Sequence, residues 1–150
     1  LIISTSRSEI PAGQPQLSAD QELFLPVPGE IALDNDWKLA AKHVDVSADI
    51  ARGNSDPWTA YVDVPQAGEL VIRTRLPGET MQPLGLNGHS STLQDIMVNR
   101  KLALRLRDRW PLVATSDQVI WLVGHNIDHR ARLTSESKAV IKLTCRRTEE

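Results

Sequence analysis

The sequence predicts an α+β fold in which antiparallel β-structure dominates, arranged like a sandwich, with one main helix packed against it. Two observations lead to this prediction. Short runs with the period of two expected of half-buried strands recur between turns rich in Gly, Pro, Asn and Asp. A single stretch at about 92–101 instead has apolar residues at helical spacing. With 150 residues, of which 41% are hydrophobic and 24% charged, the composition is typical of a globular protein.

Residues 1–57 are predicted to be a β-rich region that includes a linker. Prolines and a glycine early in this region favour a linker, because proline removes backbone donors and glycine relaxes the chain. A strand that ends at Pro28-Gly29 and a hairpin around Asp34-Asn35-Asp36 follow. The predicted elements are a linker at 11–16, a strand at 22–27, hairpin arms at 31–33 and 37–46, and a surface loop at 49–57.

Residues 58–150 form a second region that is again predicted to consist mainly of strands. Its strand-like segments alternate in apolar character and end at breakers such as Pro65 and Gly124. Cys145 lies in the last segment and is expected to face inward as a small core residue rather than to act as a nucleophile. The predicted strands are 58–64, 69–75, 111–114, 118–123 and 138–146.

Cysteine content and hydropathy bound the setting of the protein. The single cysteine excludes an internal disulfide and a Cys-based zinc site, which favours a reducing compartment such as the cytoplasm. No apolar run approaches the roughly 18 residues that span a bilayer, so no membrane partner is expected. The chain begins with Leu1, in a strand-like run, and is therefore expected to be a piece of a longer protein.

A loop followed by the helix occupies the middle of the chain. Prolines and glycines between residues 76 and 91 exclude a helix or a central strand there. The run Ser91-Thr92-Leu93-Gln94 fits a capping box, so the helix is expected to begin with Ser91 as its cap. The loop and the free N–H groups of the helix start form a workable anion site. The stripe expected to be buried consists of Leu93, Ile96, Met97 and Leu104.

Charge is divided unevenly along the chain, although the net charge is only −2. Residues 1–70 carry 4 Lys/Arg against 11 Asp/Glu, whereas residues 71–150 carry 13 against 8. An acidic half joined to a basic half suggests that only the second half meets a polyanion. A solvated charged face explains the same composition equally well.

Arginines are densest in residues 100–109, which hold five basic residues and one acid. Such clustered cations repel one another unless an anion answers them, so a polyanionic partner is favoured. The leucines of this segment are expected to point inward and its arginines outward. Arg73 and Arg75 project from one face of their strand and either bind phosphates or flank a solvent-facing edge. The candidate binding residues are Arg73, Arg75, Arg100, Lys101, Arg105, Arg107 and Arg109.

No catalytic motif is present: the chain lacks a Gly-x-Ser-x-Gly elbow, a Walker loop, a dinucleotide fingerprint and a His-Glu-x-x-His pair. His125, Asp128 and His129 have a spacing that would suit a metal on a helix, but Gly124 favours a loop with surface histidines. No catalytic or metal-binding residue is therefore assigned. With 4% aromatic residues, a bound nucleic acid is expected to be a structured helix read through its phosphates.

Several short pieces, in order and spacing, resemble the C-terminal domain of the tRNA(Ile)-lysidine synthases. They are VIRTRLPGE at 71–79, Pro83-Leu84-Gly85, Gly88, Leu93, Asp95, RDRWPL at 107–112, Ile120-Trp121, Gly124 and Ile127-Asp128. The resemblance covers roughly residues 58–146, and it implies a C-terminal domain at 58–150 that is preceded by a variable, β-rich region and linker at 1–57. Glu79 stands where the family usually has aspartate, His89-Ser90-Ser91 where lysines are common, and Ala103 where proline is frequent. The missing lysines shift the expected RNA contacts from the helix start to the arginines.

The resemblance implies a parent enzyme that uses ATP, with magnesium, to attach lysine to the wobble cytidine in the anticodon of an isoleucine tRNA. Its catalytic ATP-pyrophosphatase domain carries a Ser-Gly-Gly-x-Asp-Ser loop, which this chain lacks. ATP and lysine would therefore bind outside this chain. The chain itself would be a non-catalytic portion that binds tRNA at the acceptor stem, in the cytoplasm, with a homo-oligomer as an open possibility. The alternative is a protein-interaction β-domain with a basic docking surface and no RNA role.

Overall fold

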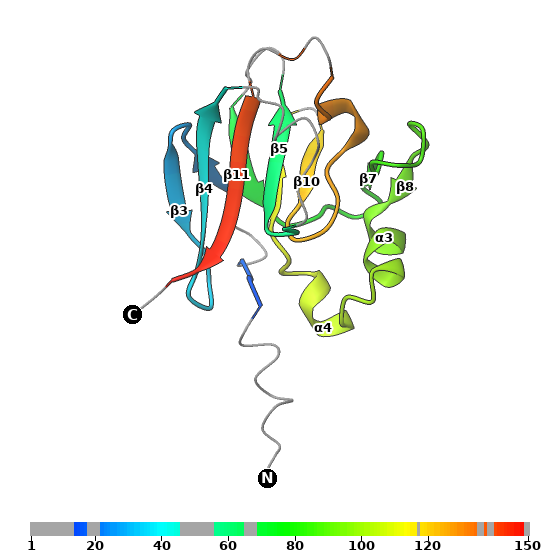
Figure 1. Cartoon of the computed structure of the whole chain (residues 1–150). Coiled ribbons are helices and arrows are strands. Elements are labelled where there is room, and N and C mark those ends of the chain that lie inside the picture. Colours follow the sequence, from blue (N-terminus) through cyan, green and yellow to red (C-terminus); the bar gives the residue numbers. More distant parts are fainter. Residues whose placement is uncertain are drawn as a thin grey trace.

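The protein is built from two four-stranded antiparallel sheets that pack against each other (Figure 1). The computed structural model describes residues 14–17, 22–45, 56–64, 69–116, 118–134, 137 and 140–148. One sheet has the order β10-β9-β6-β2, formed by Val119–Leu122, Leu112–Ala114, Leu70–Arg73 and Glu22–Leu25. The other has the order β3-β4-β11-β5, formed by Gly29–Ala32, Trp37–Val44, Val140–Arg147 and Thr59–Asp63. This arrangement confirms the α+β, mainly antiparallel class.

The hairpin between β3 and β4 follows from its turn sequence. Asn35 and Asp36 both have left-handed backbones, with φ of 63° and 65°. Asparagine and aspartate tolerate this region, and two such residues in succession match the twist of the flanking strands. The prediction of a hairpin here is confirmed. Since β2 pairs with β6 and β4 pairs with β11, strands from both sides of residue 57 share both sheets.

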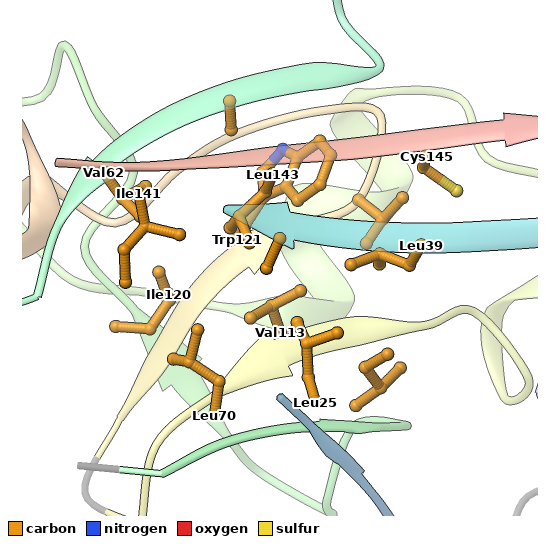
Figure 2. Close-up of a cluster of buried hydrophobic side chains, with 14 of the residues drawn as sticks. Leu25, Leu39, Val62, Leu70, Val113, Ile120, Trp121, Ile141, Leu143 and Cys145 are labelled. Carbon is orange, nitrogen blue, oxygen red and sulfur yellow. The ribbon is translucent and has the colours of Figure 1, made fainter. Parts of the chain in front are cut away.

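The main core lies between the two sheets (Figure 2). Leu39 from β4, Leu143 and Cys145 from β11, and Val113 and Trp121 from the other sheet are all buried in it. In β4 and β11, the alternation of such residues with more exposed neighbours is what predicted the strands from sequence. Cys145 faces inward as expected, and burial raises the pKa of its thiol to about 12. A thiol this weakly acidic is a core residue and not a nucleophile.

A second core covers the outer face of β9 and β10. Leu112, Val119 and Leu122 point into it, whereas Val113 and Trp121 point into the main core, so these strands are buried on both faces. This explains their continuous apolar sequence. The cover consists of β7 (Thr80–Met81), β8 (Ser91–Thr92), α3 (Leu93–Asn99) and α4 (Leu104–Arg107). The 3₁₀ turn η1 (His129–Ala131) instead places Ala131 in the main core.

The helix differs from the sequence prediction at both ends. Its N-cap is Thr92, whose hydroxyl accepts from the Asp95 amide at 3.0 Å, while Ser91 belongs to β8. It ends at Asn99 because Lys101 adopts a left-handed backbone with φ of 61°. Leu104 therefore starts a separate helix and is 74% exposed, so its placement in the buried stripe was wrong. The other predicted stripe residues, Leu93, Ile96 and Met97, are buried as expected.

Candidate functional site

The basic segment 100–109 forms a rigid corner that joins α3 and α4 to β9 (Figure 1). Leu102 and Leu106 anchor this corner because both are buried in the second core. Backbone hydrogen bonds fix it further: the Leu102 amide donates to Met97 at 2.9 Å, and the Leu106 amide donates to Ala103 at 2.9 Å. The sequence predicted that all leucines of this segment point inward and its arginines outward. This is confirmed for Leu102 and Leu106, whereas Leu104 is exposed.

Four cations of this corner have no carboxylate partner within the described part of the chain. Arg100, Lys101 and Arg105 are exposed. Arg107 is half-buried, and its Nε donates to the Leu102 carbonyl at 2.9 Å, which leaves its charge unanswered. These four residues, Arg100, Lys101, Arg105 and Arg107, are named the α3–α4 cation cluster.

Arg73 is engaged in an internal ion pair. Its Nη1 donates to Glu79 Oε1 at 2.9 Å and its Nη2 donates to Oε2 at 2.6 Å, and both side chains are only 14% exposed. The Leu76 amide also donates to Glu79, at 2.9 Å. Burial raises the pKa of the Glu79 carboxyl, but the bonds from Arg73 and Leu76 and the charge of Arg73 outweigh it, so the pKa lies below its usual value. The pair thus closes the loop that follows β6.

Arg75 and Arg109 are also paired, on opposite sides of the corner. Arg75 Nη2 donates to Asp108 at 3.1 Å. Arg109 Nη2 donates to Asp34 at 2.7 Å, and Arg109 Nε donates to the Leu17 carbonyl at 3.3 Å. Of the seven predicted residues, the structure therefore groups four in one unanswered cluster and holds three in contacts within the chain.

The loop and helix start form a groove of about 540 Å³, but its charge does not suit an anion. Its lining includes the carboxylates of Glu79, Asp95 and Asp108, against the single guanidinium of Arg75. Two of these carboxylates are paired with arginine, which leaves Asp95 beside the helix start. The anion site expected there from the glycine loop is therefore disfavoured by electrostatics.

The segment from His125 to His129 is held in place by buried contacts, and its histidines do not lie on the surface as predicted. The Asp128 side chain is fully buried, and its two oxygens accept from Gln82, from the Arg130 amide and from the Arg130 guanidinium, all at 2.8–2.9 Å. Both histidines are partly buried, and the His125 ring lies 5.5 Å from that of Trp110. The described residues contain no group of three or more His, Cys, Asp or Glu that would hold a metal ion.

His125 is held neutral by its surroundings. Burial, followed by the positive charge of Arg100, lowers the pKa of its imidazole to about 4. A neutral ring is what its packing on Trp110 requires, because a buried imidazolium would lack a carboxylate to answer it. His125 therefore lies near Arg100 of the cation cluster but adds no charge to it at neutral pH.

Sequence reasoning missed three residues that decide which arginines are available: Glu79, Asp108 and Asp34. The step of six residues from Arg73 to Glu79 offers a weak signal, since a tight turn brings such positions together. Asp34 lies 75 residues from Arg109, and no sequence pattern links the two.

Comparison with known proteins assigns relatives to this fold. Residues 70–143 match the family described as the TilS substrate C-terminal domain. A tRNA(Ile)-lysidine synthase of Symbiobacterium thermophilum is 34% identical over 157 residues, which covers 100% of this chain and 32% of that protein. That of Dehalococcoides mccartyi is 35% identical over 88 residues, covering 58% and 18%. The matches thus span about a third or less of these relatives.

One solved structure has the same fold. It is described as a crystal structure of the TilS C-terminal domain, and it superposes with a TM-score of 0.73 at 23% identity, covering 87% of this chain and 98% of that one.

Among the described residues, no helix has the length and apolar character to cross a membrane.

Proposed function

The chain belongs to the tRNA(Ile)-lysidine synthase family and carries that family's C-terminal domain, and from this premise we propose that it binds tRNA for its parent enzyme. The observation that carries the proposal is the α3–α4 cation cluster. Four cations held on one rigid corner repel one another, and a phosphate backbone relieves that repulsion. Phosphate contacts of this kind position a protein on RNA without reading its sequence.

The place of this surface in the fold supports the same role. Buried leucines fix the corner, so its cations lose little conformational freedom when they meet phosphates. The cluster has few aromatic side chains near it, and Trp110 is buried beneath it. A structured RNA helix, such as the acceptor stem, suits this surface better than unpaired bases that need stacking platforms.

We propose further that the parent is an ATP-dependent ligase that attaches lysine to the wobble cytidine of an isoleucine tRNA in the cytoplasm. ATP, magnesium and lysine would bind outside this chain, because the residues present do not fit them: the chain has no Ser-Gly-Gly-x-Asp-Ser loop, and the groove lined by residues 75–79 and 92–95 is acidic. The domain would then select and orient the tRNA while the reaction takes place elsewhere.

A protein-docking role is the second candidate, and one observation favours it. Arginines of the basic half already meet carboxylates of the acidic half, Arg109 with Asp34 and Arg146 with Asp56. Such pairs show that the two halves are electrostatically complementary. In this alternative, the α3–α4 cation cluster would dock on an acidic protein surface instead of on RNA.

Salt-dependent binding separates the two roles. The unmodified isoleucine tRNA transcript is titrated with the full chain, and log K is measured against log salt. We expect a linear decrease, with a slope of about −0.7 to −0.9 for each phosphate neutralised. The double variant Lys101→Glu with Arg105→Glu should lower the magnitude of the slope by about 2. Arg132→Glu, at an exposed arginine outside the cluster, is the control, and its charge change matches that of each of the two substitutions measured singly. Equal slopes for the double variant and this control would refute the proposed RNA surface.

A further inference from the structure

The outer face of the β4–β11 pair carries a second group of cations, set by strand register. Alternation along each strand points Leu39, Leu143 and Cys145 into the core, so the residues between them face solvent. Lys42 is directly opposite Lys142. Lys38 is directly opposite Arg146. These two rows are four residues apart along the strands, which corresponds to about 13 Å.

In the row formed by Lys38 and Arg146, both cations have carboxylate partners within the chain. Lys38 lies 3.6 Å from Glu30, and Arg146 pairs with Asp56. Both pairs are about half exposed. Lys38 is held weakly by its pair, whereas Arg146 also donates to the Thr59 hydroxyl and to the Cys145 carbonyl.

The row formed by Lys42 and Lys142 is different. Like charges directly opposite on neighbouring strands destabilise a sheet. Within the described residues, neither Lys42 nor Lys142 has a carboxylate at ion-pair distance; the Lys142 ammonium lies 5.9 Å from the centre of the Tyr61 ring instead. The sheet thus keeps an unfavourable pair at the centre of an exposed face, and an anion bound between the two ammonium groups would remove the cost.

The surface between the rows is shaped to admit an anion. A hollow of about 300 Å³ is lined by Lys38, Ala40, Ala41, Lys42, Lys142, Thr144 and Arg146. Its floor between the cation rows consists of the small side chains Ala40 and Thr144, and no carboxylate is among the described residues that line it. Two acids flank this face: Glu30 is opposite Ala40 on β3, and Asp63 is opposite Val140 on β5.

We propose that this hollow, centred on Lys42 and Lys142, is a second binding surface for the phosphodiester backbone of RNA. It goes beyond the α3–α4 cation cluster, since it shares no residue with it and lies on a different part of the molecule: β4 and β11 form the middle of one sheet, and the two helices lie beyond the edge of that sheet (Figure 1). Two separate cationic surfaces let one domain contact an RNA at two places.

An RNA backbone fits this face better than a protein partner does. Protein interfaces rely on apolar anchors at their centre and are poor in lysine there. The exposed large apolar residues of the described chain are Phe24, Leu76, Leu84, Leu86, Val98 and Leu104, and none of them is in β4, β11 or β5. This face instead carries positive charge around a floor of small side chains.

The single substitution Lys42→Glu tests the proposal in the full chain. It turns the like-charged pair with Lys142 into an oppositely charged pair, so the melting temperature should be unchanged or raised. Affinity for the tRNA transcript should fall by roughly tenfold at 0.1 M salt, and the magnitude of the salt slope by about 1 to 2. Lys42→Gln, which removes one charge, should produce about half of that effect.

Controls make each outcome decisive. Arg132→Glu carries the same charge change elsewhere, and equal tRNA affinities and slopes for it and Lys42→Glu would overturn the proposal. Polyglutamate serves as an acidic protein surrogate; if Lys42→Glu weakens polyglutamate binding but leaves tRNA binding unchanged, the face binds proteins and the proposal fails. Lys101→Glu with Arg105→Glu is measured in parallel. Loss of tRNA binding in Lys42→Glu but not in that double variant would refute the α3–α4 surface alone, and the converse would refute this one alone.

Discussion

Arg73 and Glu79 form a two-pronged ion pair in which both side chains are 14% exposed, and the same carboxylate accepts the Leu76 amide. One interaction thereby satisfies a nearly buried guanidinium and closes the turn that follows β6. An arginine that looks available in the sequence is in this way part of the scaffold.

Glu79→Gln should destabilise the fold by about 2 kcal/mol, because it leaves the Arg73 charge unanswered in a mostly buried setting. Urea unfolding measures this loss. Asp34→Asn is the matched control: it breaks the Arg109 pair, in which the side chains are 49% and 42% exposed, and the cost should stay below about 0.5 kcal/mol. Equal losses in the two variants would show that the Arg73 pair has no special structural weight.

Stability should fall as the pH is lowered from 6.5 toward 4, because of His125. Its folded-state pKa, about 4, lies below the ordinary value of 6.5, so between these values the unfolded chain binds a proton that the folded chain does not. The loss should be on the order of 2 to 3 kcal/mol, discounted for partial exposure of the ring. His125→Phe should flatten this dependence in urea unfolding at several pH values, whereas replacement of the exposed His43 by Gln should preserve it. An unchanged slope in His125→Phe would contradict the assignment.

Arg109→Glu should lower the free energy of unfolding by about 1 kcal/mol, because it sets a carboxylate against Asp34 and loses the bond to the Leu17 carbonyl. Arg105→Glu has the same charge change within the α3–α4 cation cluster and should alter stability by less than about 0.5 kcal/mol. Thermal unfolding of both variants compares them. A larger stability loss in Arg105→Glu would mean that the cluster is held by contacts not recognised above. Binding tests are therefore best made at Lys101 and Arg105.

Thr92→Ala should destabilise the protein by about 1 kcal/mol, since it removes the hydroxyl that caps the Asp95 amide of α3. Ser91→Ala, one residue earlier, should have little effect, because Ser91 lies in β8 and does not cap the helix. Denaturant unfolding of the pair distinguishes the two positions. A greater loss of stability for Ser91→Ala would show that Ser91 is the N-cap, as the sequence predicts.

Local patterns made much of the fold predictable. Alternation identified the strands that carry Leu39 and Leu143, and the Asn35-Asp36 turn defined a hairpin, since both depend on neighbours in the sequence. The helix ends were misplaced because the decisive features are subtle: a threonine competing with a serine for the cap, and a left-handed Lys101 that ends α3. That conformation at a non-glycine residue has no reliable sequence signature.

The family, the β-rich class and the basic corner were predictable from the amino-acid sequence, since composition, alternation and ordered motifs are properties of the chain. Which cations remain available for a ligand depends instead on the folded arrangement. Ion pairs form across distances in the chain that no local pattern encodes: 33 residues separate Arg75 from Asp108, and 75 separate Arg109 from Asp34. The opposition of Lys42 and Lys142 likewise exists only in the register of β4 and β11. The sequence specifies which residues are charged, whereas the fold specifies which of them form ion pairs.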